Sequence, residues 1–130
     1  MTLQSCALVL LGGFLGGLAR MFVSNVVSRR IGEAFPWGTL VVNISGALAI
    51  GVLAGIARRF GGLPTSEMFR DLVFIGFLGG YTTVSSFALQ TLVLAREGRS
   101  VKAVAYVVLS GGLCVAAVAA GFSIMVRLWV

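Results

Sequence analysis

Acidic and imidazole side chains are scarce in this sequence. It contains no histidine, and its four acids are Glu33, Glu67, Asp71 and Glu97. Each acid lies between long apolar stretches or at the edge of one, so no carboxylate stands inside such a stretch to carry a proton or act as a general base. Serines and threonines are frequent, but none has a recognisable base partner that would make it a nucleophile. These absences argue against an enzyme and against proton-coupled export.

Cysteine and charge are scarce as well. Cys6 and Cys114, the two cysteines, fall within apolar stretches and have neither metal-ligand spacing nor a disulfide framework. Charged residues make up 11% of the chain, whereas soluble proteins have about a quarter. The ten basic residues give a net charge of +6 but form no continuous patch, which argues against a nucleic-acid partner. We expect them to contact anionic lipid headgroups.

Apolar residues dominate what remains, at 58% of the chain. A helix needs about 20 mainly apolar residues to cross a bilayer. Stretches of this kind cover residues 3–27, 38–57, 72–94 and 103–127. The separators are short and combine glycine or proline with arginine, as in water-facing turns. We therefore predict an all-α, multi-pass membrane protein with four transmembrane helices and a single domain spanning 1–130.

The basic residues are divided almost evenly between the two sides of the membrane. One side holds four, Arg58, Arg59, Arg70 and Arg127, and the other holds five, Arg29, Arg30, Arg96, Arg99 and Lys102. Because the Lys/Arg asymmetry of short loops sets orientation, this balance predicts dual topology. Two copies inserted in opposite senses could then pair as a closed antiparallel homodimer. The alternative is a single orientation decided by one or two residues.

Small residues and one charge interrupt the first stretch. It contains two overlapping pairs of glycines four residues apart, Gly12 with Gly16 and Gly13 with Gly17. Such pairs indicate close helix packing. Arg20 either extends to the headgroups or lines a wet vestibule. The word GFLGG occurs at 13–17 and again at 76–80, and we interpret this recurrence as a consequence of composition.

Polar residues also lie inside the second and fourth stretches. Asn43 either joins helices by hydrogen bonding or donates to an anion. Tyr106, Ser110 and Cys114 recur every four residues, so they share one helix face. The alternative for Ser110 is a hydrogen bond to its own backbone.

The segment GFLGGYTTVSSF, residues 76–87, is unsuited to a continuous helix. Glycines and β-branched threonines are poor helix formers, so we expect the third helix to break near Gly79 to Thr83. Non-helical backbone at membrane depth survives only where it is buried in protein or lines water. Carbonyls freed by the break could bind a cation, as broken helices do in transporters. The alternative is an intact helix whose glycines serve packing.

Three segments together carry a resemblance to a known family. PWGTLVVNISGALAIG (36–51), GFLGGYTTVSSFALQT (76–91) and GGLAR (16–20) resemble the small fluoride channels of the Fluc (CrcB) family, and the likeness extends over essentially the whole chain. The resemblance implies a fluoride-selective passive channel in the bacterial inner membrane. Such a channel exports fluoride from the cell and so protects against its toxicity. It is an antiparallel dual-topology homodimer with two pores.

The resemblance also assigns roles to residues. It implies a structural sodium ion at the dimer centre, held by the backbone carbonyls of Gly79 and Thr82. It implies a vestibule arginine at Arg20. The implied pore residues are the anion donor Asn43, the aromatic Phe87 and a polar track of Tyr106, Ser110 and Cys114.

Two positions depart from the family pattern. Relatives commonly read TTFSTF where this chain reads TTVSSF, so Val84 occupies the place of one pore phenylalanine. Gln90 stands where many members carry glutamate. Two other functions are compatible with four short spans. A small dual-topology coupled exporter of organic cations is disfavoured by the lack of a membrane-embedded carboxylate. A non-transporting membrane subunit would leave the hydroxyl-rich break unexplained.

Overall fold

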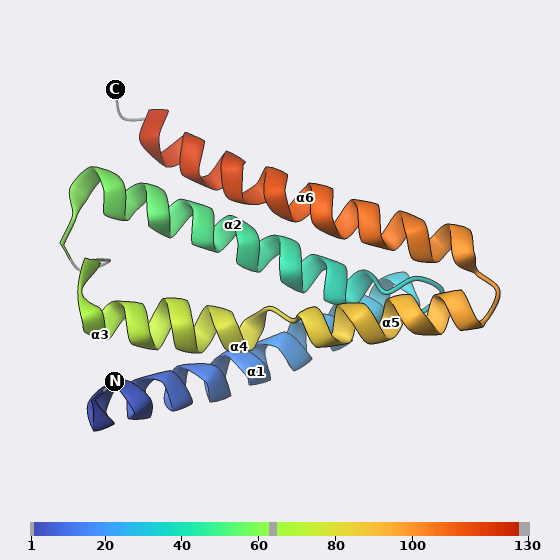
Figure 1. The fold of residues 1–130 in the computed structure, drawn as a ribbon, viewed down its shortest axis with the longest axis horizontal. Helices are drawn as coiled ribbons and strands as arrows, with labels where there is room; N and C mark the ends of the chain where they lie inside the picture. Colours follow the sequence, from blue (N-terminus) through green and yellow to red (C-terminus); the bar gives the residue numbers. More distant parts are fainter. Residues whose placement is uncertain (1, 63–64, 128–130) are drawn as a thin grey trace.

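The computed structural model describes residues 2–62 and 65–127, which form four long helical passages that run alternately in opposite directions (Figure 1). The passages are α1 (Leu3–Ile31), α2 (Trp37–Phe60), a composite third passage, and α6 (Ser100–Arg127). The third passage consists of α3 (Glu67–Phe69), the π-helix η2 (Arg70–Leu78), α4 (Gly79–Tyr81) and α5 (Val84–Arg96). Within the described residues, four helices are long and apolar enough to cross a membrane. The predicted all-α, four-span fold is confirmed.

The helices extend beyond the predicted apolar stretches. Arg29 and Arg30 were predicted in a loop but occupy the last turn of α1, and Arg58 occupies the last turn of α2. Basic side chains at a helix C-terminus interact favourably with the helix dipole, so polar sequence continues the helix there. Gly61 ends α2 with a φ of 60°, a conformation that favours glycine.

Glycines of α1 pack directly against the third passage. A methyl group added at Gly12 would overlap the carbonyl oxygen of Leu72, and one added at Gly16 would overlap that of Phe77. Gly17 has nothing within 4 Å of its added methyl. Close packing is therefore confirmed for Gly12 and Gly16, whereas Gly17 makes no such contact with the residues that the structure describes.

The two GFLGG words lie against one another across the same contact. A methyl group added at Gly80 would lie 2.8 Å from Gly13 Cα, and one added at Gly13 would lie 3.9 Å from the Gly76 oxygen. We interpreted the repeated GFLGG word as a consequence of composition. In the structure, its two copies pack against one another where α1 meets the third passage.

A buried carboxylate lies at the start of η2. Asp71 is 4% exposed, and its Oδ1 accepts from Arg70 Nη2 at 3.2 Å. The ion pair with the half-exposed Arg70 offsets part of the cost of burying this charge.

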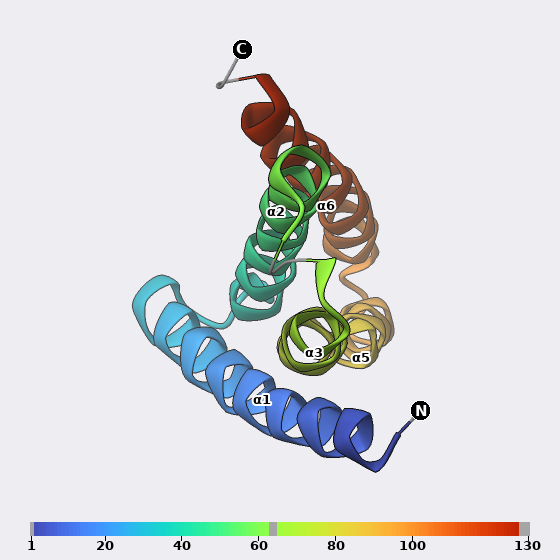
Figure 2. The same ribbon diagram turned by 90° about the vertical axis from the view of Figure 1, so that its left-hand side faces the viewer.

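The remaining passages form a second layer. Figures 1 and 2 show α2 and α6 side by side along most of their lengths, whereas α1 packs mainly against the third passage and also contacts α2. A methyl group at Gly121 would lie 2.7 Å from the Leu48 oxygen, so these two helices also meet through a glycine. A buried cluster of Leu40, Leu94, Ala103 and Tyr106 joins α2, α5 and α6, with Phe35, Trp37, Ile44 and Phe87 packed around it.

Candidate functional site

The third passage breaks at two threonines. Thr82 (φ −75°, ψ 157°) and Thr83 (φ −151°, ψ 121°) are extended, and α5 begins at Val84. Thr83 caps this new helix, because its Oγ1 accepts from Ser86 N at 3.1 Å. The predicted break is confirmed, and the alternative of an intact helix is wrong.

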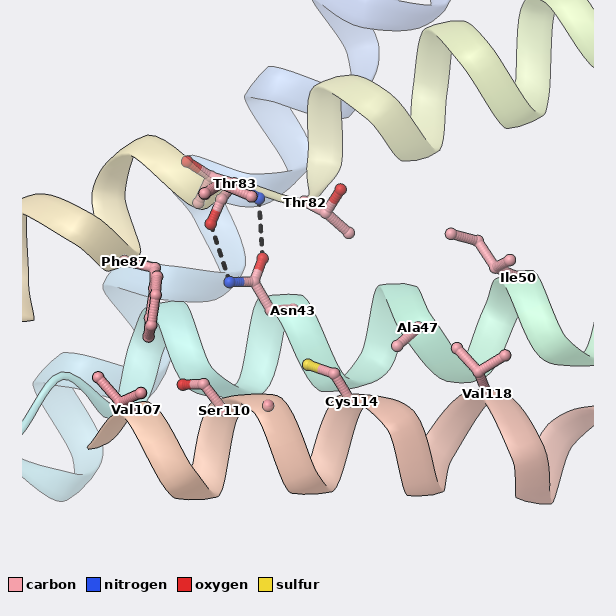
Figure 3. Close-up of a pocket in the computed structure, with 12 residues that line it drawn as sticks. Asn43, Ala47, Ile50, Thr82, Thr83, Phe87, Val107, Ser110, Cys114 and Val118 are labelled. Atoms are coloured by element: carbon pink, nitrogen blue, oxygen red, sulfur yellow. Dashed lines mark hydrogen bonds between the residues drawn. The ribbon is translucent and has the colours of Figure 1, made fainter. Parts of the chain in front are cut away.

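Asn43 of α2 holds the broken backbone by two hydrogen bonds. Its Nδ2 donates to Thr83 O at 2.9 Å, and its Oδ1 accepts from Thr83 N at 2.8 Å (Figure 3). The side-chain amide thus replaces the hydrogen-bond partners that a continuous helix would give the backbone N–H and C=O of Thr83. These groups need partners because Thr83 is buried, with 6% of its surface exposed. An amide carries two N–H donors, so one of them remains for another acceptor.

Several carbonyls lose their helical donors at the break, those of Gly79 and Thr82 among them. In a continuous helix the Thr83 N–H would bond to Gly79 O, and the Ser86 N–H to Thr82 O. Here these two donors bond instead to Asn43 Oδ1 and to Thr83 Oγ1. Carbonyl oxygens suit a hard cation, so the donor set at Gly79 and Thr82 fits the implied sodium ion.

A cavity of about 430 Å³ lies beside the break, between α2, α5 and α6 (Figure 3). It is lined by Asn43, Ala47, Ile50, Thr82, Thr83, Val84, Phe87, Val107, Ser110, Gly111, Cys114 and Val118. The wall is therefore mainly hydrocarbon, with a few amide, hydroxyl and thiol groups. Five predicted pore residues meet here: Asn43, Val84, Phe87, Ser110 and Cys114.

Ser110 offers an unsatisfied hydroxyl to this cavity. The side chain is 7% exposed, and its Oγ has no hydrogen-bond partner in the part of the chain that the structure describes. The alternative of a bond to its own backbone is therefore not realised. Leaving a buried hydroxyl unpaired costs about 1–3 kcal/mol, so a ligand or water that accepts from it would be favoured.

Tyr106 lies behind the cavity wall. It is fully buried and is not among the residues that line the cavity. Its ring centroid lies 5.2 Å from that of Phe87, and its hydroxyl donates to Gln90 Oε1 at 3.0 Å. The predicted track is thus divided: Ser110 and Cys114 face the cavity, and Tyr106 supports Phe87.

A second, more polar cavity of about 470 Å³ lies beyond this tyrosine. It is lined by Ser24, Asn25, Ser28, Glu33, Phe35, Pro36, Leu89, Gln90, Val93, Leu94, Glu97 and Arg99. Arg99 Nη1 pairs with Glu97 Oε2 at 3.3 Å, and its Nη2 donates to Ala34 O. Tyr106 contacts a residue of each cavity, so Phe87, Tyr106 and Gln90 lie between them. Arg20 lines neither cavity.

Two contributors were missed from sequence. The role of Thr83 could have been inferred from its residue type, because threonine is among the residues preferred at the N-cap of a helix. Nothing local to Gln90 indicates its bond to Tyr106, 16 residues away.

Val84 is 80% exposed at the cavity rim, so a partner or lipid must cover it in the membrane.

Comparison with known proteins places the chain in a family. Residues 7–122 match the model of the CrcB-like protein, Camphor Resistance (CrcB) family. A protein named fluoride-specific ion channel FluC 4 from Brucella abortus biovar 1 (strain 9-941) is 52% identical over 94% of this chain and 92% of its own length. FluC 2 of Bradyrhizobium diazoefficiens is 49% identical over 88% of this chain and 83% of its own. FluC of Methylobacterium radiotolerans is 48% identical over 93% and 84%. With this match along nearly all of its length, and with the break in the third helix where it was expected, the chain belongs to the CrcB-like family.

Proposed function

We propose that the protein is a passive fluoride channel that lets fluoride leave the cell. The observation that carries the proposal is the cavity at the break, where Asn43, Ser110 and Phe87 meet in a chain about half identical to proteins named fluoride-specific ion channels. These relatives are bacterial, which supports a place in the bacterial inner membrane.

Fluoride is small and strongly hydrated, so a pore must offer several donors and still release the ion. The free N–H of Asn43 and the hydroxyl of Ser110 are such donors, and the positive edge of the Phe87 ring adds a weak attraction. No Lys or Arg lines the cavity to trap the ion. Cys114 continues this wall, Tyr106 holds the ring of Phe87, and Arg20 draws anions toward the pathway.

The working unit is an antiparallel, dual-topology homodimer. Gly79, Val84 and Ser85 are exposed in the single chain, and they lie at or next to the break. A second copy would cover them and complete the cavity wall. A sodium ion at the two-fold axis would be coordinated by the backbone carbonyl oxygens of Gly79 and Thr82. The ion would take the place of the N–H donors that these carbonyls lose at the break.

The cation site is tested by two substitutions. Gly79→Val places a branched side chain beside the carbonyls and should prevent assembly or conduction. Thr82→Ser should be mild, because the ligand is backbone and the serine hydroxyl can still donate to Leu78 O, as Thr82 Oγ1 does at 2.9 Å. Equal loss in both variants would contradict a backbone site.

Conduction is tested with purified protein in liposomes loaded with fluoride or chloride. Fluoride should leave without a proton gradient, and chloride should be retained. Fluoride efflux that requires a proton gradient, or equal flux of both anions, would refute the proposal. Reporters fused to the C-terminus should read both sides of the membrane, and a reporter that reads one side only would exclude dual topology.

A further inference from the structure

An open apolar groove runs along the outer face of α6. It has a volume of about 460 Å³ and is lined by Cys114, Val115, Val118, Ala119 and Phe122. Val115 is 70% exposed. Eight residues separate the ends of the groove, which makes it about 12 Å long at 1.5 Å per residue. Every lining group is hydrocarbon or sulfur.

An unpaired cation stands at one end of this groove. The guanidinium carbon of Arg58 lies 6.0 Å from the centroid of the Phe122 ring. Arg58 is exposed and forms no ion pair or hydrogen bond with any residue that the structure describes. It belongs to the last turn of α2, and Arg127 ends the neighbouring α6 at the same end of the molecule (Figure 1).

We propose that this groove binds an anionic phospholipid, with its phosphate on Arg58 and one acyl chain along α6. The positive charge and the apolar groove are arranged along α6 as the headgroup and acyl chain of such a lipid are arranged across the membrane. Arg58 and Arg127 lie near the membrane surface, where headgroups are, and the groove leads from Phe122 toward Cys114, which lies deeper in the span. A guanidinium can donate two parallel hydrogen bonds to a phosphate.

The lipid would also form part of the cavity wall. Cys114 and Val118 line both the groove and the cavity beside the break. An acyl chain lying against these two residues would cover the cavity only on its α6 side. Anionic lipid should therefore raise flux as well as bind.

The experiment is native mass spectrometry of the purified protein, titrated with dioleoyl phosphatidylglycerol or dioleoyl phosphatidylcholine. The wild type should retain phosphatidylglycerol preferentially. Arg58→Gln should reduce that preference about five-fold, as expected for one basic residue at the membrane surface. Arg30→Gln is the matched control, because Arg30 occupies the last turn of α1 at the other end of the molecule, and it should leave this high-preference binding unchanged.

A second variant tests the acyl-chain site. Val118→Trp fills the groove and should reduce retention of both lipids. Equal effects of Arg58→Gln and Arg30→Gln would overturn the headgroup assignment. Unchanged retention in Val118→Trp would overturn the groove assignment. The groove assignment would also be overturned if Val118→Trp converted the dimer to a monomer without loss of bound lipid. That result would mean that a second copy of the chain, and not a lipid, covers the groove.

Discussion

Replacing Gly16 by alanine tests how α1 holds the broken passage in place. The added methyl group would overlap Phe77 O and lie 2.8 Å from Tyr81 N. Both are backbone atoms, so neither can rotate away, and α1 must move outward. Gly17 is the matched control, because it is the next residue of the same helix and has nothing within 4 Å of its added methyl.

The magnitude follows from two opposing effects. Alanine is favoured over glycine in a helix by about 1 kcal/mol, and this gain applies to both variants. Overpacking a close contact costs about 1–3 kcal/mol, and this cost applies to Gly16→Ala alone. Gly17→Ala should therefore be neutral or up to about 1 kcal/mol more stable than the wild type. Gly16→Ala should be about 1–3 kcal/mol less stable than Gly17→Ala.

The assay is equilibrium unfolding of the two variants in mixed detergent, followed by fluoride efflux from liposomes. Tyr81 is the last residue before the break, so displacing it should disturb Thr82 and reduce flux in Gly16→Ala. Gly17→Ala should conduct like the wild type. Equal stability and equal flux in the two variants would show that the glycine contact does not position the break.

Three further substitutions address the cavity. Asn43→Leu leaves the N–H and C=O of Thr83 unpaired, so it should lower the free energy of unfolding by about 2–6 kcal/mol and abolish fluoride flux; wild-type stability would contradict this. Phe87→Ile should reduce flux severely without changing the oligomeric state of the purified protein. The exposed control Phe14→Ile, at a site 64% exposed, should conduct normally. Normal flux in Phe87→Ile would show that this ring does not line the pathway. Val84→Phe introduces the phenylalanine that the resemblance predicts, at an 80% exposed rim, so flux in liposomes should be equal or faster. A loss of flux would show that the rim has no room for the ring.

The helical passages and the break were predictable because each follows from local sequence. Apolar stretches of membrane length determine the passages, and glycines followed by threonines weaken the third helix where Thr82 and Thr83 are extended. Helix ends were less predictable. Arginines such as Arg58 were assigned to loops by polarity, whereas a C-terminal turn accommodates them.

Contacts between passages were not predictable in the same way. Gly16 and Gly17 have equivalent spacing patterns, and only the placement of α1 against η2 distinguishes them. Tyr106 shares a helix face with Ser110, yet its larger side chain fills the core and reaches Gln90 of α5. A spacing of four residues shows that side chains share one helix face, but it does not show which residues of other helices they contact.

The role of Asn43 depends on such a distant contact. The sequence left two interpretations, a hydrogen bond between helices or an anion donor. Its partner Thr83 is 40 residues away, and the pairing uses Oδ1 and one N–H of the amide. The second N–H is then fixed in direction by the other two bonds, in a side chain that lines the cavity. We propose that Asn43 has both roles at once. Its two hydrogen bonds to Thr83 hold the broken backbone and also orient its second N–H, so that fluoride meets a preorganised donor.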